Sequence, residues 1–192
     1  EETEASFAKN EIPPDFARAL AKATWPGRSQ VMGDPGVDNL TFYLDGAHTI
    51  ESMRHSAEWF TNTARATADH NVMLFNCMEE RSPQELLEPV VDVFASSSAV
   101  KLEHALFAPP DSVTSKLDKS VDDKKTTWQE HCSRTWDDIV AKRAAPVVRQ
   151  SQSQVFSGTA GVVSPSLQQA LALLRRRATE VAPARVNVLV TG

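Results

Sequence analysis

The stretch LTFYLDGAHTIESMRHSAEWF, residues 40–60, changes its pattern abruptly in the middle. Residues 40–44 are a largely apolar run without in–out alternation, which is typical of a strand buried on both faces of a sheet. From residue 50 onward, apolar side chains recur at three- and four-residue steps, which predicts a helix with one apolar stripe. The members of this stripe are Ile50, Met53, Ala57, Phe60 and Ala64. A strand that leads directly into a helix favours an α/β fold.

The same alternation continues along the chain. Apolar runs predict strands at residues 71–75, 104–108 and 186–190, and weaker signals predict short strands at 29–32 and 153–156. Helical spacing predicts further helices at residues 13–24, 82–95, 126–143 and 164–178. We therefore predict a Rossmann-like, mostly parallel sheet of about six strands with helices on both faces.

Particular residues predict where these helices begin and break. Ser82 and Ser164 are each followed by proline, so we expect them to be N-caps with proline at the first helical position. Pro89 is expected to kink or split its helix. We expect surface loops at residues 111–125 and 144–152. One apolar face of the helix at 126–143 is formed by Trp128, Cys132, Trp136 and Ile139.

The composition limits the class of protein. A chain of 192 residues with 41% hydrophobic residues and a formal net charge of −5 suits one soluble globular domain. An acidic balance argues against a nucleic-acid partner, and the basic run at 175–177 is interpreted as a solvated helix face. No apolar stretch approaches the roughly 20 residues of a membrane span. Cys77 and Cys132 could pair in principle, but a reduced intracellular chain is the simpler interpretation.

Polar residues stand where the first strand meets its helix. In open parallel sheets, ligands bind outside the carboxyl ends of the strands, and Asp45 to Thr49 would lie at such an end. Thr49 would cap the helix, whose N-terminus would face an anion. Asp45 would accept hydrogen bonds from a ribose, and His48 would reach a phosphate or carboxylate. The alternative is that Asp45 and His48 only satisfy each other and the turn.

Arg28 is a second candidate, because it follows the stiff turn Trp25-Pro26-Gly27. Its guanidinium would clamp a phosphate, or it would simply lie over the Trp25 ring at the surface. No histidine, cysteine and acid have metal-ligand spacing, so no metal site is predicted. No P-loop, GxGxxG or GxSxG pattern occurs, so the main phosphate cradle for any nucleotide would have to come from elsewhere.

Five segments carry a family resemblance. They are WPGRSQV (25–31), LTFYLDGAHTIESM (40–53), MLFNCMEERSP (73–83), TTWQEHCSRTWDDI (126–139) and VNVLVTG (186–192). In this order they resemble the C-terminal domain of folylpolyglutamate synthase, its eukaryotic form in particular. The DGAHT element is similar to the D-x-A-H-N/T pattern of the wider Mur ligase superfamily. The likeness runs from about residue 14 to residue 192, nearly the whole chain.

The resemblance implies an ATP-dependent ligase that adds L-glutamate to the γ-carboxyl of folate glutamate tails through an acyl phosphate. It implies that Arg28 contacts the ATP phosphates, that Asp45 holds the ATP ribose, and that His48 is the catalytic residue between ATP and the incoming glutamate. Mg²⁺ and most of the ATP contacts would belong to an N-terminal P-loop domain. The other implied partners are tetrahydrofolate and its polyglutamates, and the full-length enzyme would be a monomer of the cytoplasm, the mitochondrion or both.

The chain departs from this family in two ways. It has no P-loop, and the family continues after VTG with a serine tied to glutamate binding. We therefore expect residues 1–24 to be a lead-in with a short helix and residues 25–192 to be a Mur-ligase-type C-terminal domain that is inactive alone. Two alternatives remain open. One is a non-catalytic module that binds a nucleotide or a partner, and the other is a related ligase such as dihydrofolate synthase.

Overall fold

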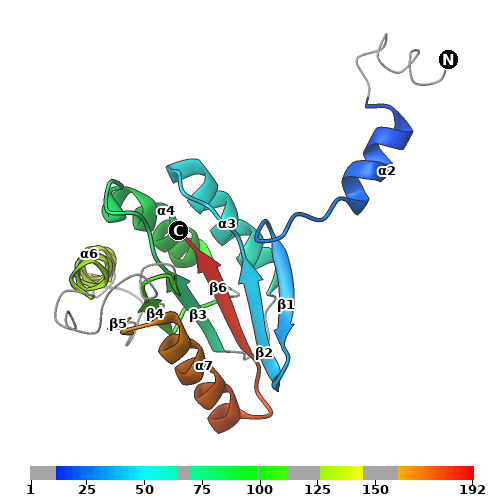
Figure 1. The fold of residues 1–192 in the computed structure, drawn as a ribbon. Helices are drawn as coiled ribbons and strands as arrows, with labels where there is room; N and C mark the ends of the chain where they lie inside the picture. The colour runs from blue at the N-terminus through cyan, green and yellow to red at the C-terminus, as the bar shows by residue number, and fades with distance from the viewer. Residues whose placement is uncertain (1–11, 65–69, 99, 112–125, 145–159) are drawn as a thin grey trace.

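A computed structural model describes residues 12–64, 70–98, 100–111, 126–144 and 160–192 (Figure 1). The helices are α2 (Pro14–Lys22), α3 (Ile50–Thr63), α4 (Pro83–Ser96), α6 (Thr127–Ala144) and α7 (Leu167–Val181). The strands are β1 (Gln30–Asp34), β2 (Val37–Leu44), β3 (His70–Phe75), β4 (His104–Phe107), β5 (Gly161–Val163) and β6 (Val186–Thr191).

The six strands form one sheet in the order β1-β2-β6-β3-β4-β5. The edge strand β1 is antiparallel to β2, and the other neighbouring pairs are parallel. The carboxyl ends of β2, β6, β3 and β4 therefore meet at one edge of the sheet, as Figure 1 shows. The predicted fold, a mostly parallel sheet of six strands, is confirmed.

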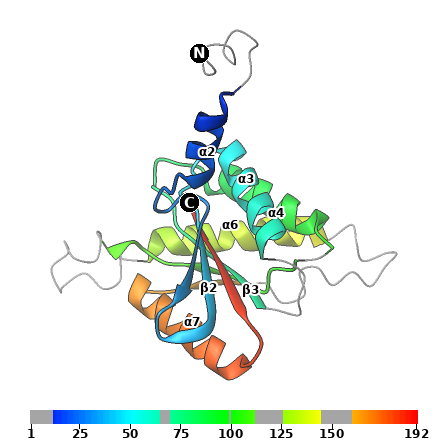
Figure 2. The ribbon, with the colours of Figure 1, turned by 90° about the vertical axis from the view of Figure 1, so that its right-hand side faces the viewer.

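Each face of the sheet has its own core, because successive side chains of a strand point to opposite faces. Tyr43, Met73 and Leu189 pack with α3, α4 and α6 on one face. Phe42 and Val188 pack with α7 on the other. Figure 2, turned by 90°, shows α7 on the opposite side of the strands from α3 and α4. Helices thus cover both faces, which explains why the strands are continuous apolar runs rather than alternating ones.

The start of α3 is held by a capping box. The Ser52 N–H donates to the Thr49 hydroxyl at 3.2 Å, and the Thr49 N–H donates to the Ser52 hydroxyl at 2.9 Å. The reciprocal bonds satisfy two donors that a helix start would otherwise leave to water. The predicted cap at Thr49 is confirmed, and it determines where the loop at residues 45–48 ends.

We expect Thr49→Ala to lower the free energy of unfolding by about 1 kcal/mol, the usual cost of losing an N-cap side chain. Thr61→Ala on the same helix is the matched control. Its hydroxyl bonds the Glu58 carbonyl at 3.0 Å and caps no helix start, so we expect a change within about 0.5 kcal/mol. Urea unfolding measures both values, and equal losses would contradict the importance of the cap.

Three predictions about the helices and strands need correction. The helix with Pro89 is not split: α4 runs through it, because Pro89 and six other buried residues of the helix pack into the core. The last helix begins at Leu167, with Ser166 rather than Ser164 as its N-cap. Ser164 is buried and donates to the Ser166 carbonyl at 3.0 Å. The residues before Ser164 form the short strand β5, which was not predicted.

Some predictions fall where the structure gives no description. The strand expected at 153–156 lies outside the described residues, and so do the loops expected at 111–125 and 144–152 apart from their first residues, Asp111 and Ala144. Elsewhere the predicted face of α6 is confirmed, since Cys132, Trp136 and Ile139 are buried and Trp128 is half-buried. The Ile50 end of the α3 stripe is exposed, whereas its other members are buried.

Helix α2 stands clear of the sheet in both views (Figures 1 and 2). None of its residues is buried, and Phe16 and Leu20 are 53% and 67% exposed. The helix predicted from spacing alone is confirmed, but it adds nothing to either core. Among the described parts of the chain, no helix combines the length and the apolar character that crossing a membrane requires.

Candidate functional site

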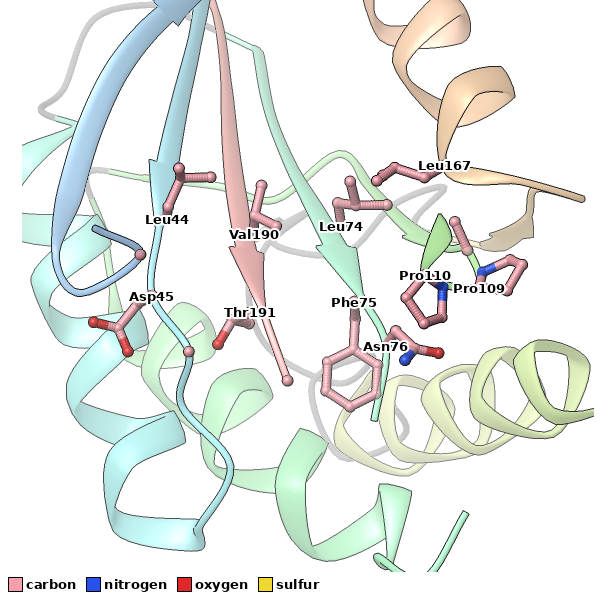
Figure 3. A pocket seen from close by; sticks show the side chains of 14 residues that line it. Leu44, Asp45, Leu74, Phe75, Asn76, Pro109, Pro110, Leu167, Val190 and Thr191 are labelled. Carbon is pink, nitrogen blue, oxygen red and sulfur yellow. The ribbon is translucent and has the colours of Figure 1, made fainter. Parts of the chain in front are cut away.

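An open cleft of about 400 Å³ lies at the edge of the sheet where four parallel strands end (Figure 3). One wall is apolar, and it comes from strand ends, the loop after β4 and the start of α7. Its residues are Leu44, Leu74, Ala108, Pro109, Pro110, Leu167 and Val190. The rim toward β2 and β3 carries the polar groups Asp45, Asn76 and Thr191 and the backbone of three glycines, Gly27, Gly46 and Gly192. A cleft of this kind suits a ligand with a flat apolar part and a polar part.

Asp45 follows β2 directly and faces a neighbouring turn. Its Oδ2 accepts a hydrogen bond from the Ser29 N–H at 2.8 Å and another from the Ser29 hydroxyl at 3.2 Å. Ser29 has a φ of 43°, in the left-handed region that non-glycine residues seldom occupy. The Asp45 carboxylate therefore stabilises this turn, and the structure supports that half of the alternative interpretation.

Arg28 lies against the same loop rather than over Trp25. Its Nη1 donates to the Gly46 carbonyl, and the Gly46 N–H donates to the Gly27 carbonyl at 2.9 Å. A Cβ at Gly46 would lie 3.1 Å from Arg28 Nη1 and 3.2 Å from its Cζ. The absence of a side chain at Gly46 is thus what lets the guanidinium approach the backbone. The structure places Arg28 beside the loop that contains Asp45.

His48 is exposed and is fixed by the backbone around it. Its Nδ1 lies 2.9 Å from the Gly46 carbonyl, and its own N–H donates to the Ser52 hydroxyl at 3.0 Å. A carbonyl only accepts, so Nδ1 carries the proton in this bond. The Nε2 atom is then the nitrogen that can act on a ligand. His48 and Asp45 bond different partners, so the idea that they satisfy each other is wrong.

Arg81 and Asn76 join this group without having been predicted. Arg81 Nη1 donates to the His48 carbonyl at 2.7 Å, across from the loop after β3. Asn76 follows β3 and lines the cleft. Both lie in residues 76–83, directly after the apolar run at 71–75 that predicted a strand. The signal that could have found them is the rule that loops after parallel strands meet at one edge.

The two cysteines lie beside this loop. Both are free and buried, Cys77 in the loop itself and Cys132 on α6. Hydrogen bonding with Cys132 is the main reason why the pKa of Cys77 lies below its ordinary value, against the opposing effect of burial and with help from the charge of Arg81. The bond and burial together raise the pKa of Cys132.

The positively charged side chains beside the cleft favour an anionic ligand. Arg28, His48 and Arg81 bring two fixed positive charges and one imidazole to the loops after β2 and β3, while the Asp45 carboxylate is bonded to Ser29. Among the residues that the structure describes, no group of three or more His, Cys, Asp or Glu side chains could hold a metal ion. The site as described can bind and orient an anionic ligand.

The fold matches two solved structures of ligases. One is folylpolyglutamate synthase from Mycobacterium tuberculosis complexed with ADP and AMPPCP, with a TM-score of 0.57, 14% identity, and coverage of 97% of this chain and 34% of that chain. The other is MurF from Acinetobacter baumannii, with a TM-score of 0.53, 14% identity, and coverage of 99% and 32%. At this identity the match concerns the fold, which is that of an α/β domain of the Mur ligase type.

Two curated relatives from Arabidopsis thaliana, both named folylpolyglutamate synthase, identify the protein family of this chain. One is 33% identical over 171 residues, covering 67% of this chain and 27% of the relative. The other is 30% identical over 217 residues, covering 94% of this chain and 37% of the relative. The chain belongs to the folylpolyglutamate synthase family. It spans about a third of the length of these relatives. No protein-family model matches it.

Proposed function

We propose that this chain is the C-terminal domain of an ATP-dependent ligase that adds L-glutamate to the γ-carboxyl of folate glutamate tails. The observation that carries the proposal is the meeting of Arg28, Asp45 and His48 at the carboxyl end of β2, beside a cleft and a capped helix start. Membership of the folylpolyglutamate synthase family supports it. In this proposal residues 25–192 form the domain, and residues 1–24 are a lead-in.

The reaction gives the three residues distinct tasks. The terminal phosphoryl group of ATP passes to the folate γ-carboxylate, and the amine of glutamate then attacks the acyl phosphate and displaces inorganic phosphate. Arg28 would neutralise charge on the phosphates, and Asp45 would accept from the ribose hydroxyls through the carboxylate oxygen that Ser29 does not use. His48 Nε2 would lie between the phosphates and the incoming amine.

In this proposal part of the site comes from another domain. The chain spans about a third of the length of its relatives, and we assign Mg²⁺ and the main phosphate cradle to an N-terminal P-loop domain of the same protein. Closure of that domain on the cleft would exclude water from the acyl phosphate, which water would otherwise hydrolyse. We propose that the full-length protein acts as a monomer in the cytoplasm, the mitochondrion or both.

The test uses the full-length gene product that contains this sequence. Purified protein is incubated with ATP, Mg²⁺, labelled L-glutamate and a tetrahydrofolate substrate, and the products are separated by chain length. We expect products extended by one or more glutamates. Parallel reactions with dihydropteroate distinguish a dihydrofolate synthase, because that enzyme adds the first glutamate and would use dihydropteroate instead. No ligation with any folate would refute the proposal and leave the non-catalytic module as the better explanation.

In the full-length protein, Asp45→Ala should raise the KM for ATP by about tenfold, the size expected for losing a hydrogen bond to a charged group. Asp45→Asn separates the two tasks of the side chain. Its carboxamide oxygen can still accept from the Ser29 N–H, so the turn at Ser29 keeps this hydrogen bond while the negative charge toward the ribose is lost. Steady-state kinetics at saturating glutamate give the values. An unchanged KM for ATP in Asp45→Ala would show that the carboxylate serves the turn alone.

A further inference from the structure

Two side chains at the start of α6 donate hydrogen bonds to the loop that follows β3. The Trp128 indole N–H donates to the Cys77 carbonyl at 2.7 Å, and Gln129 Nε2 donates to the Asn76 Oδ1 at 2.8 Å. These residues belong to the Trp-Gln-Glu-His-Cys segment, which none of the tasks proposed above uses. Adjacent residues of one helix thus hold the backbone and the side chain of a loop that lines the cleft.

The bond from Gln129 determines which end of the Asn76 carboxamide faces the cleft. Because the Asn76 oxygen accepts from Gln129, its NH₂ group is directed away from α6. Figure 3 shows the oxygen of Asn76 toward α6 and the nitrogen toward the Phe75 side of the cleft. Reversing Asn76 alone would leave the Gln129 NH₂ group without the acceptor that Asn76 now supplies. The observed arrangement therefore favours Asn76 as a donor toward a ligand.

A glutamine is unusual at a buried helix position such as 129 if its side chain only packs against its neighbours. Gln129 is 5% exposed, and its Oε1 is buried without a hydrogen-bond partner among the described residues. A buried acceptor without a partner is destabilising, and an apolar side chain of similar length would avoid that cost. The retained amide is explained if its NH₂ group is needed to orient Asn76.

We propose that Asn76 binds the ligand of this cleft through its NH₂ group and that Gln129 is a positioning residue that acts through Asn76. The acceptor would be an anionic oxygen, either of a phosphate or of a carboxylate, because Arg28, His48 and Arg81 bond the backbone of the loop after β2, beside the cleft. This inference rests on the proposed function, since it assigns Asn76 to one of the two anionic substrates of the ligase.

The experiment compares Asn76→Ala, Gln129→Met and the double variant in the full-length protein, with KM measured separately for ATP and for L-glutamate. Methionine keeps the length of glutamine and removes the bond to Asn76. We expect Asn76→Ala to raise one KM about tenfold. A rise confined to ATP assigns the contact to a phosphate, and one confined to glutamate assigns it to a carboxylate. Gln129→Met should raise the same KM less, and it should add nothing in the Asn76→Ala background.

Asn76→Asp is a second variant of nearly unchanged shape. It still accepts from Gln129 but turns a negative oxygen toward the cleft, so the same KM should rise further than in Asn76→Ala. Gln84→Met, at an exposed position of α4 where the amide bonds only Glu88 of the same helix, is the control for the glutamine-to-methionine change and should leave both KM values unaltered. If neither KM moves in Asn76→Ala, or if Gln129→Met adds its full effect in the double variant, the inference is wrong. A wild-type protein that ligates glutamate would then still support the proposed function. An inactive wild-type protein would contradict both the proposed function and the inference about Asn76.

Discussion

His48→Ala in the full-length protein is expected to lower kcat for glutamate addition by about 10²-fold, the scale on which a donor to developing charge usually acts. The imidazole is exposed at the rim, and its Nδ1 is fixed on the Gly46 carbonyl at 2.9 Å. Because that bond orients the ring, Nε2 is held in one direction without help from a substrate. The side chain fills no core position, so the melting temperature should change little.

Two further variants separate the role of Nε2 from that of the loop. His48→Asn retains a short side chain with an N–H group that can donate to the Gly46 carbonyl, but it has no equivalent of Nε2. We expect it to be as impaired as His48→Ala if Nε2 acts on the reacting groups. His55→Ala, at an exposed position of α3, should have wild-type kinetics. A loss of many degrees in melting temperature with intact kcat would contradict the role given to His48.

The pattern of the sequence predicts this fold because both faces of the sheet are covered. Runs such as residues 40–44 and 186–190 had to be largely apolar, because both of their faces are buried under helices. The shortest strand escaped prediction for a physical reason. Gly161–Val163 has three residues, none of them buried, so it leaves no apolar run to detect. The start of α7 was misplaced because two serines, Ser164 and Ser166, both precede the helix and only packing distinguishes them.

The sequence predicted where the site lies in the fold, but it did not predict the hydrogen bonds within the site. Asp45 and His48 do follow a strand that ends at the cleft, as topology requires. The contacts of their loop were not predictable, since Ser29 reaches Asp45 over 16 residues and Arg28 reaches Gly46 over 18 residues from a separate turn. Predicting the contact between Arg81 and His48 would also have required the order of the strands. The loop with Arg81 faces His48 only because β6, the last strand in the chain, pairs between β2 and β3.

Helix α3, which begins two residues after His48, contains one of the largest fully buried side chains of the domain. Phe60 is fully buried, with its ring centroid 5.0 Å from that of Tyr43 on β2 and 5.8 Å from that of Phe94 on α4. Truncating a buried phenylalanine removes apolar contacts and leaves a cavity that its neighbours fill only in part. We expect Phe60→Ala to lower the free energy of unfolding by about 3–5 kcal/mol.

Phe16→Ala is the matched control, because that side chain is 53% exposed on α2, where no residue is buried. Its effect on the free energy of unfolding should stay within about 0.5 kcal/mol. Urea titration of the 192-residue chain measures both variants against the wild type. Equal effects would show that the aromatic cluster around Phe60 does not hold α3 on the sheet. In that case the loop with Asp45 and His48 would be positioned by its own hydrogen bonds to Ser29, Gly46 and Ser52 rather than by the core beneath it.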